Sequence, residues 1–282
     1  MGSFRLIATF LIITVSPALA VSAQELKPEE IITKHIESIG KKEVLDRVST
    51  LFAVGTSSFE SQSPAVKGGG KAIIVSDRDN LMLAFSLNSR DYPFEKIGFF
   101  HDKVTLPFIT AGQRSLLGEF LVEHPRVLSE GLFGGTMTLR WPIRVLEQRK
   151  SKLKMLGTKK IEGRKMFVLA YQPDGGGLDE FSIKLYFDAE TFEHVQTVYH
   201  REVAADQPKF GQGNQLANSE LTLTERYSDF KAVDGLTLPY IYSVEFASNS
   251  TASSYKTTWG IKVSQYYINQ KLTPDFFTFD VK

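Results

Sequence analysis

The sequence of 282 residues contains no cysteine. This absence excludes disulfide bonds, cysteine nucleophiles and anchoring through a lipid-modified N-terminal cysteine. The folded chain must therefore be held together by its apolar core, and it is long enough to bury one. We expect a leader over residues 1–23 and a single domain over residues 24–282.

The chain also has little net charge. It carries 33 basic and 32 acidic residues, a formal net charge of +1 at pH 7. If Arg5 is removed with the leader, the net charge falls to about zero. Nothing in the overall charge indicates a nucleic-acid partner, so none is expected.

Long apolar runs are missing as well. The apolar run at residues 6–15 is too short to cross a bilayer, which needs roughly 20 apolar residues. It lies between the basic Arg5 and a stretch of small residues, which is the order of a secretory signal peptide rather than of a buried N-terminal helix. Cleavage fits after Ala20 or Ala23, and we favour the second site, which leaves Gln24 first. The sequence thus predicts a periplasmic protein with neither a lipid anchor nor a membrane span.

Catalytic and metal-binding motifs are scarce. The sequence has no Gly-x-Ser-x-Gly motif, and its five histidines show no spacing typical of a zinc site. We therefore expect no catalytic residues, metal or cofactor. His194 and His200 share strand parity and are predicted to be surface or rim residues. Asp188 and Glu190 fit a turn with solvated acids better than a glycosidase pair.

Helical spacing of apolar residues predicts an amphipathic helix over Pro28–Ile39, with a proline near its start and Gly40 just past its end. A shorter helix is expected over Lys42–Arg47, and another over residues 111–128. The Gly-containing segment at residues 132–137 fits a loop or a strand. The glycine triplets at residues 68–70 and 175–177 are predicted to be hairpin tips, because neither has the context of a phosphate-binding loop.

Most of the remaining chain alternates apolar and polar residues between turn signals, which predicts strands joined as hairpins in an antiparallel meander. Aromatic residues make up 12% of the chain, which suits a β-protein and would also suit a protein that holds an apolar ligand. The predicted strands cover residues 51–60, 70–76, 81–87, 96–101, 103–108, 152–156, 165–171, 181–187, 194–203, 221–228, 238–246 and 254–267.

Strand parity places large apolar side chains on one face of this sheet, and such a face must be covered by helices, a second sheet or a ligand. We predict that this face lines a ligand site. Its candidate lining residues are Leu83, Phe85, Leu87, Ile183, Leu185, Phe187, Tyr240, Tyr242, Val244, Trp259, Ile261 and Val263.

Basic residues dominate residues 144–165, from Arg144 to Lys165, where only Glu147 and Glu162 are acidic. Such a stretch could attract an anionic membrane surface. A solvated hairpin face that protects a sheet edge explains it at least as well.

Several passages resemble the LolA-like superfamily of periplasmic lipoprotein carriers and their relatives. They are the opening helix that ends at Ile39-Gly40, the turn at residues 187–191, the passage at residues 230–239 and the terminal residues 269–279. The resemblance implies an α+β, mainly antiparallel fold. In it, an incomplete, half-open β-barrel has helices covering its concave apolar face, which accepts acyl chains. The helices at Pro28–Ile39 and residues 111–128 are candidates for that cover.

The leading hypothesis is a monomeric periplasmic carrier or sensor that binds a lipid or lipoprotein acyl chain in an apolar cavity without catalysis. Its expected partners are a hydrophobic ligand and lipoproteins or membrane-associated proteins. The alternatives are a structural or partner-binding envelope protein with a packed interior and, third, a hydrolase with dispersed catalytic residues. The size of the interior cavity distinguishes the first two.

Overall fold

The computed structural model describes residues 26–62, 65–175, 178, 180–203, 219–250 and 254–279. The predicted signal peptide and its cleavage sites lie outside these residues. Among the described residues, no helix combines the length and the apolar character needed to cross a bilayer.

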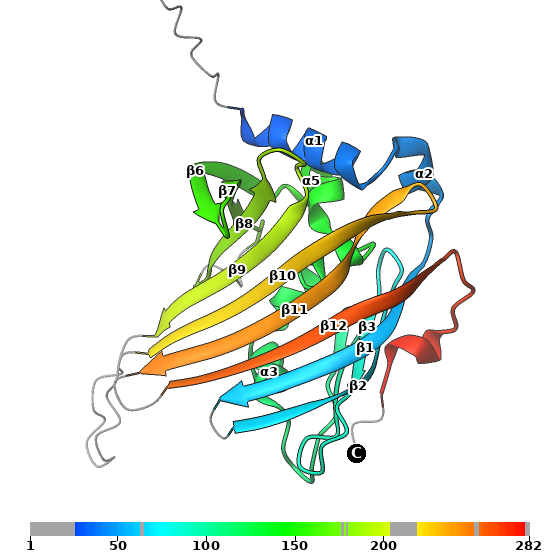
Figure 1. Cartoon of the computed structure of the whole chain (residues 1–282), viewed down its shortest axis with the longest axis vertical. Coiled ribbons are helices and arrows are strands. Elements are labelled where there is room, and N and C mark those ends of the chain that lie inside the picture. The colour runs from blue at the N-terminus through cyan, green and yellow to red at the C-terminus, as the bar shows by residue number, and fades with distance from the viewer. Residues whose placement is uncertain are drawn as a thin grey trace, which may run out of the picture.

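Two helices open the fold at their predicted positions, α1 (Pro28–Ile39) and α2 (Lys42–Arg47). At the start of α1 the Glu30 carboxylate accepts a hydrogen bond from the backbone N–H of Lys27 at 2.7 Å, which satisfies a free helix donor. The apolar stripe of α1 is buried, whereas its polar side is exposed. Figure 1 shows α1 lying across one end of the sheet.

The rest of the fold is built on one antiparallel sheet of twelve strands, so the predicted meander is confirmed. The strand order is β5-β4-β3-β2-β1-β12-β11-β10-β9-β8-β7-β6. Strands that are consecutive in sequence are neighbours in the sheet, except β5 and β6, which form its two edges. In addition, the first strand, β1, pairs with the last, β12. The strands are β1 (Leu51–Gln62), β2 (Ala65–Ser76), β3 (Leu81–Ser86), β4 (Phe94–Phe100), β5 (Lys103–Thr105), β6 (Lys152–Ile161), β7 (Arg164–Gln172), β8 (Ser182–Asp188), β9 (His194–Val203), β10 (Ser219–Val233), β11 (Leu236–Ser250) and β12 (Ser254–Ile268).

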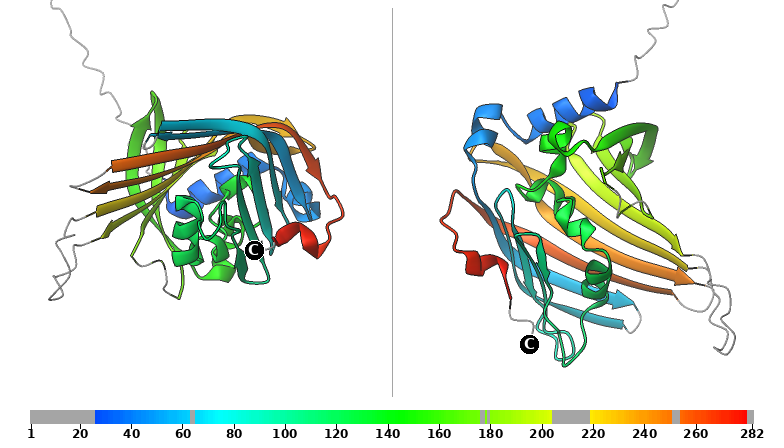
Figure 2. Two further views of the ribbon diagram at one scale, coloured as in Figure 1. Left: turned by 90° about the horizontal axis from the view of Figure 1, so that it is seen from below. Right: turned by 180° about the vertical axis from the view of Figure 1, so that it is seen from behind.

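Because β5 and β6 are not paired with each other, the sheet curls without closing. Short helices between these two edge strands lie on its concave face, as the two views of Figure 2 show. We call residues 116–149 the helical cover. It contains α3 (Leu116–Glu123), α4 (Arg126–Ser129), the 3₁₀ turns η1 (Gly135–Met137) and η2 (Pro142–Val145), and α5 (Leu146–Arg149). The predicted fold class, an incomplete barrel with helices over its concave face, is confirmed.

The predicted helix over residues 111–128 is wrong in extent. Thr110 and Gln113 pair in a short bridge, and α3 begins only after Ser115, whose Oγ accepts from the Gly118 N–H at 2.7 Å. Pro125 follows the end of α3 and disfavours helical backbone at the residue before it. Residues 132–137, expected as loop or strand, form turns and η1.

The glycine triplet at residues 68–70 lies inside β2 and not at a hairpin tip, so that prediction is also wrong. A Cβ on Gly69 would lie 2.6 Å from the carbonyl oxygen of Ser57, and one on Gly70 would lie 2.7 Å from that of Ser86. The glycines therefore reflect close approach of neighbouring strands rather than a turn. Gly175 does lie in a turn after β7, while the other two residues of its triplet lie outside the described residues.

On the convex face, the C-terminal turn η3 (Pro274–Phe277) packs Phe277 against Val75 and Met82. This small cluster is separate from the main core, which lies between the concave face and the helical cover. Every large aromatic side chain that is less than 2% exposed, apart from Phe277, belongs to that main core.

Candidate functional site

The twelve residues predicted to line a ligand site lie on β3, β8, β11 and β12 or directly beyond, and the fold brings them together. Eleven are buried members of one core cluster, whereas Tyr240 is half-buried and packs against that cluster. They are Leu83, Phe85, Leu87, Ile183, Leu185, Phe187, Tyr240, Tyr242, Val244, Trp259, Ile261 and Val263.

The helical cover packs directly on this concave face. The Phe120 ring lies 5.1 Å from that of Phe246 and 5.8 Å from that of Phe181, measured between centroids. Leu117, Leu121 and other cover residues belong to the same core cluster as the predicted lining residues. The concave face is therefore packed against protein in this structure.

A buried carboxylate, Glu225 on β10, ties the cover to the sheet. It is 0% exposed and accepts hydrogen bonds from the hydroxyls of Tyr199, Tyr227 and Tyr242 at 3.0, 3.0 and 2.6 Å. It also accepts from the backbone N–H of Gly134 in the cover at 2.7 Å. Burial raises the pKa of Glu225 because its charged form is deprived of water, and these donors partly oppose that rise.

A second tie joins α1, the cover and the sheet through aromatic rings. The Trp141 indole N–H donates to His35 Nε2 at 3.0 Å, and His35 Nδ1 lies 2.9 Å from the carbonyl oxygen of Phe192. Trp141 also stacks on His194 with centroids 4.5 Å apart. Because burial lowers the pKa of His35 to about 4, the ring is neutral at pH 7, as an acceptor for the indole must be.

A third buried polar group is formed by Tyr92, Glu95 of β4 and Trp259 of β12. The Tyr92 hydroxyl donates to Glu95, and it accepts from the Trp259 indole N–H at 2.7 Å. Glu95 is 3% exposed, and burial raises its pKa to about 7. This carboxyl group therefore titrates near neutral pH inside the core.

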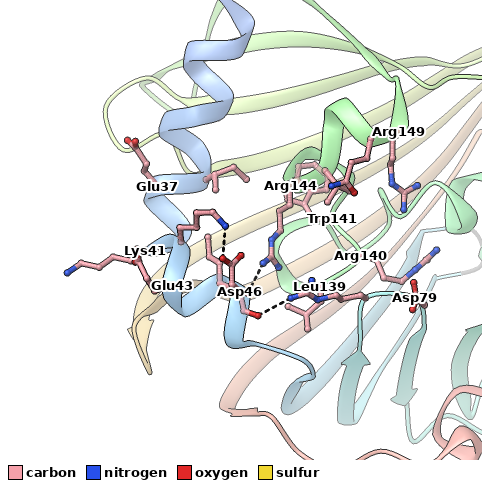
Figure 3. A pocket seen from close by; sticks show the side chains of 17 residues that line it. Glu37, Lys41, Glu43, Asp46, Asp79, Leu139, Arg140, Trp141, Arg144 and Arg149 are labelled. Carbon is pink, nitrogen blue, oxygen red and sulfur yellow. Dashed lines mark hydrogen bonds and ion pairs between the residues drawn. The ribbon is translucent and has the colours of Figure 1, made fainter.

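A large cavity lies beside the helical cover, at the end of the sheet where α1 and α2 pack (Figure 3). Its volume is about 950 Å³, which is within the range of small-molecule sites. Its apolar lining comes from α1, α2 and the cover, and consists of Ile36, Leu45, Leu139, Trp141 and Val145. We call it the arginine cavity, because Arg78, Arg140, Arg144 and Arg149 also line it.

A much smaller void lies further in. Its volume is about 10 Å³, about the space that one water needs. Four side chains line both the arginine cavity and this void, and therefore form the wall between the two spaces. They are Leu45, Leu139, Trp141 and Arg144. The inner void also touches Leu51, Leu236 and Leu238, which belong to the main core. The arginine cavity is thus separated from the core of the concave face by one layer of side chains.

A third space, of about 630 Å³, is an open groove lined mainly by β1, β2 and β3 and the start of β4. It is lined by small and apolar residues together with Lys71 and Lys96. No polar side chains with shared hydrogen bonds converge there among the residues that the structure describes, and we assign it no role.

The structure differs from the prediction in the burial of two titratable residues, His194 and Asp188. His194 is 0% exposed and not a surface or rim residue. A β-bulge between Tyr186 and Phe187 of β8 and their partners shifts the register, so that Phe187 pairs with His194 and parity changes along β9. His194 therefore faces the core, whereas His200 bonds Thr222 at 3.2 Å and is half-buried.

Asp188 does lie in the predicted turn, but its carboxylate is buried and not solvated. It accepts hydrogen bonds from the backbone N–H groups of Glu190 and Thr191 and pairs with Arg164 at 3.0 Å. This Asx-type turn uses the acid to hold the β8–β9 connection. Glu190 is exposed, as predicted.

The basic stretch at residues 144–165 divides into two parts. Arg144 and Arg149 belong to the cover and line the arginine cavity. The second part lies on the edge strand β6, where four lysines are exposed: Lys152, Lys154, Lys159 and Lys160. Exposed lysines on an edge strand hinder pairing with another sheet, which agrees with the interpretation as a sheet-protecting face.

Sequence reasoning missed the buried polar groups, although strand parity carries a signal for two of them. Glu225 lies on the same face of β10 as Leu223 and Tyr227, which is the apolar face. Glu95 lies on the same face of β4 as Ile97. An acid on the apolar parity of a strand must find buried donors or change its pKa. The described residues contain no group of three His, Asp or Glu side chains that could hold a metal ion.

No protein-family model and no curated protein matches the chain. Among solved structures, a LolA superfamily protein from Nitrosomonas europaea is similar, with 11% identity and a TM-score of 0.47 over 90% of this chain and 98% of that one. A domain from Vibrio parahaemolyticus, provisionally described as an outer membrane lipoprotein-sorting protein, has 12% identity and a TM-score of 0.45 over 88% and 94%. A DUF1329 family protein from Desulfovibrio piger has 10% identity and a TM-score of 0.42 over 88% and 96%. All three similarities are at low sequence identity, and one of the three structures is a LolA superfamily protein.

Proposed function

We propose that this chain is a periplasmic carrier or sensor that binds a lipid or lipoprotein acyl chain without catalysis. The acyl chain enters through the arginine cavity and continues along the concave face, where it replaces part of the helical cover. The residues of the concave face that now contact the cover would then contact the ligand.

The wall between the arginine cavity and the inner void supports this proposal most directly. Leu139 and Trp141 line both spaces, and the residues beyond them are core leucines. Rotation of these two side chains would join a cavity of about 950 Å³ to the apolar interior. Leu139 and Trp141 lie in the short segment between η1 and η2, which contain three and four residues. Isolated turns of this length have little stability of their own and depend on their packing.

The free energy gained by burying an acyl chain can be compared with that lost when cover side chains leave the sheet. Each methylene group that leaves water contributes about 0.8 kcal/mol, so ten buried methylenes contribute roughly 8 kcal/mol. The ligand must offset the loss of contacts between the cover and the sheet, and burial of Leu or Phe side chains is worth about 1.5–3 kcal/mol each. A chain of that length can therefore compete with two or three side chains of the cover.

Native mass spectrometry of the purified mature protein, together with lipid extraction, tests the proposal. We expect a co-purifying acyl species, or uptake of a fluorescent fatty acid added to delipidated protein. If no acyl species is found and the delipidated protein takes up no fluorescent fatty acid, the proposal is wrong.

A matched pair of variants tests the route. Leu139→Ala should speed uptake of the fluorescent fatty acid, because it thins the wall between cavity and void. Leu117→Ala removes an equally apolar buried side chain of the cover that lines neither space. It should lower stability without the same gain in rate, and equal rates for the two variants would contradict entry through this wall.

The packing of the concave face favours a second candidate, a structural or partner-binding envelope protein. Eleven of the twelve predicted lining residues are buried under the cover in this structure. For that function, the fluorescent fatty acid should not bind, and the same protein should instead retain a protein partner from envelope extracts.

A further inference from the structure

The four arginines of the arginine cavity come from two distant parts of the chain. Arg78 lies in the turn between β2 and β3, while Arg140, Arg144 and Arg149 belong to the helical cover. Figure 3 shows Arg140, Arg144 and Arg149 around the same space, with Trp141 between them. The fold therefore gathers cationic groups that the sequence keeps apart.

Backbone carbonyl oxygens hold each of these guanidinium groups. Arg78 donates to the carbonyl of Asp46 and Arg144 to that of Leu45, both at 3.1 Å. Arg149 donates to the carbonyl of Glu130 at 2.9 Å. Arg140 donates to the carbonyls of Leu128 and Ser129 at 2.5 and 3.2 Å.

Within the described part of the chain, none of the four pairs with a carboxylate, whereas other arginines such as Arg164 and Arg201 do. Arg140 is the extreme case, because it is 5% exposed and its Nε has no hydrogen-bond partner. Its guanidinium lies over the Phe99 ring at 3.9 Å. A buried cation without an anion is costly unless a ligand supplies the counter-charge.

The arginines also repel one another. Burial is the main reason that the pKa of Arg140 falls to about 10, and the charge of Arg149 contributes, while the charges of Asp102, Asp77 and Asp79 oppose the fall. Burial likewise lowers the pKa of Arg144, with a contribution from Arg78. An anion bound between them would relieve this repulsion.

Acidic residues also line the cavity, but they do not neutralise it. The lining contains four acidic and six basic side chains. The acidic ones are Glu37, Glu43, Asp46 and Asp79, and the basic ones are the four arginines with Lys41 and Lys42. Asp46 is engaged by Lys42 at 2.5 Å, and all four acids are exposed. The buried side of the cavity therefore remains cationic.

We propose that the arginine cavity binds a phosphate group, either free or as the headgroup of an anionic lipid. Planar guanidinium groups match phosphate oxygens in pairs, which makes arginine the preferred side chain for this recognition. The apolar wall of Leu139 and Trp141 beside the arginines suits the first methylenes of an acyl chain. The choice of a lipid rests on the proposed function, whereas phosphate recognition does not.

Three probes separate these claims when they are titrated by calorimetry into the delipidated mature protein. Hexadecanoyl lysophosphatidate carries phosphate and chain, hexadecanoylglycerol carries the chain alone, and inorganic phosphate carries the anion alone. We expect the lysophosphatidate to bind at least about tenfold more tightly than the neutral lipid, a difference of about 1.4 kcal/mol.

Variants identify the site. Arg144→Gln should remove that tenfold preference, measured as the ratio of the affinities for lysophosphatidate and hexadecanoylglycerol in the same variant. Because Arg144 is partly buried, Arg78→Gln provides a second test at an exposed position and should reduce the preference as well. Arg47→Gln removes an equal charge from α2 at an exposed residue that does not line the cavity, and should leave the preference intact.

The outcomes distinguish the two proposals. Binding of phosphate and lysophosphatidate without binding of the neutral lipid would support the anion site and contradict acyl-chain binding. Equal affinities for the two lipids, unaffected by Arg144→Gln and Arg78→Gln, would overturn the anion site and leave the proposed function standing. Binding of none of the three probes would overturn both.

Discussion

The titration of Glu95 gives the sharpest quantitative prediction for the stability of this fold. Burial raises the pKa of Glu95 from 4.5 to about 7, while the hydrogen bonds from Ser115 and Tyr92 only partly oppose the shift. Between these two pH values the folded state holds a proton that the unfolded chain has released. The contribution of Glu95 to stability should therefore be greatest below pH 4.5 and should decrease as the pH rises through 7.

The size of the effect follows from the two pKa values. One pKa unit corresponds to about 1.36 kcal/mol, so the complete change is about 3 kcal/mol. Between pH 5 and pH 8 the expected loss is about 2.5 kcal/mol, because part of the change occurs below pH 5. Glu95→Gln keeps an oxygen that can accept from Tyr92 and removes the ionisation, so its stability should lack this component.

The assay is urea unfolding of both proteins at pH 5 and at pH 8. The free energy of unfolding of the parent, relative to Glu95→Gln, should fall by about 2.5 kcal/mol from the lower to the higher pH. Other titrating groups are common to both proteins and cancel in this comparison. Parallel pH profiles for the two proteins would refute the burial of an ionisable Glu95.

Three further predictions concern the core, the cover and the leader. Leu185→Asp places a carboxylate at a position that is 0% exposed; it should cost several kcal/mol and abolish folding or expression, and a variant that melts like the parent would show that the inward face is wrongly assigned. Trp141→Phe leaves His35 without its indole donor and should lower the free energy of unfolding by about 1–3 kcal/mol, so an unchanged urea midpoint would speak against this tie. Protein from the envelope fraction should begin at Gln24 or Val21 by N-terminal sequencing, and an uncleaved start would contradict export by a cleaved signal.

Much of the sheet could be predicted from the sequence because its pairings are local. Alternation of apolar and polar residues located all twelve strands, and turn signals between them gave the antiparallel meander. The errors arose where a local pattern had two physical causes. Glycines at residues 68–70 look like a turn, but close approach of neighbouring backbones requires them as well.

Parity also fails wherever a bulge inserts a residue. The shift between β8 and β9 moved His194 to the core side, and nothing in the local sequence indicates where such an extra residue falls. The helical cover was hard to predict for another reason. Its elements contain three to eight residues, too few for a helical period to be recognised.

The predicted lining residues were identified as a group because they share strand faces, but the space above them depends on how the cover packs. The arginine cavity could not be predicted, since Arg78 and Arg140 meet only in the folded chain. A basic residue between Leu139 and Trp141 was the available signal, because a cation within an apolar stretch requires compensation.

The pairing of the first strand with the last has a consequence for how the molecule folds. Strands β1–β5 and strands β6–β12 each form from neighbours in sequence, so either set can begin to assemble on its own. The seam between β1 and β12 is different, since the adjoining hydrogen bond from Ser49 to Asn269 spans 220 residues. Contacts between residues so far apart in sequence form slowly, because a long loop must close before the contacts are made. The seam can form only after nearly the whole chain has been synthesised, and until then β1 and β12 remain open to pairing with other chains.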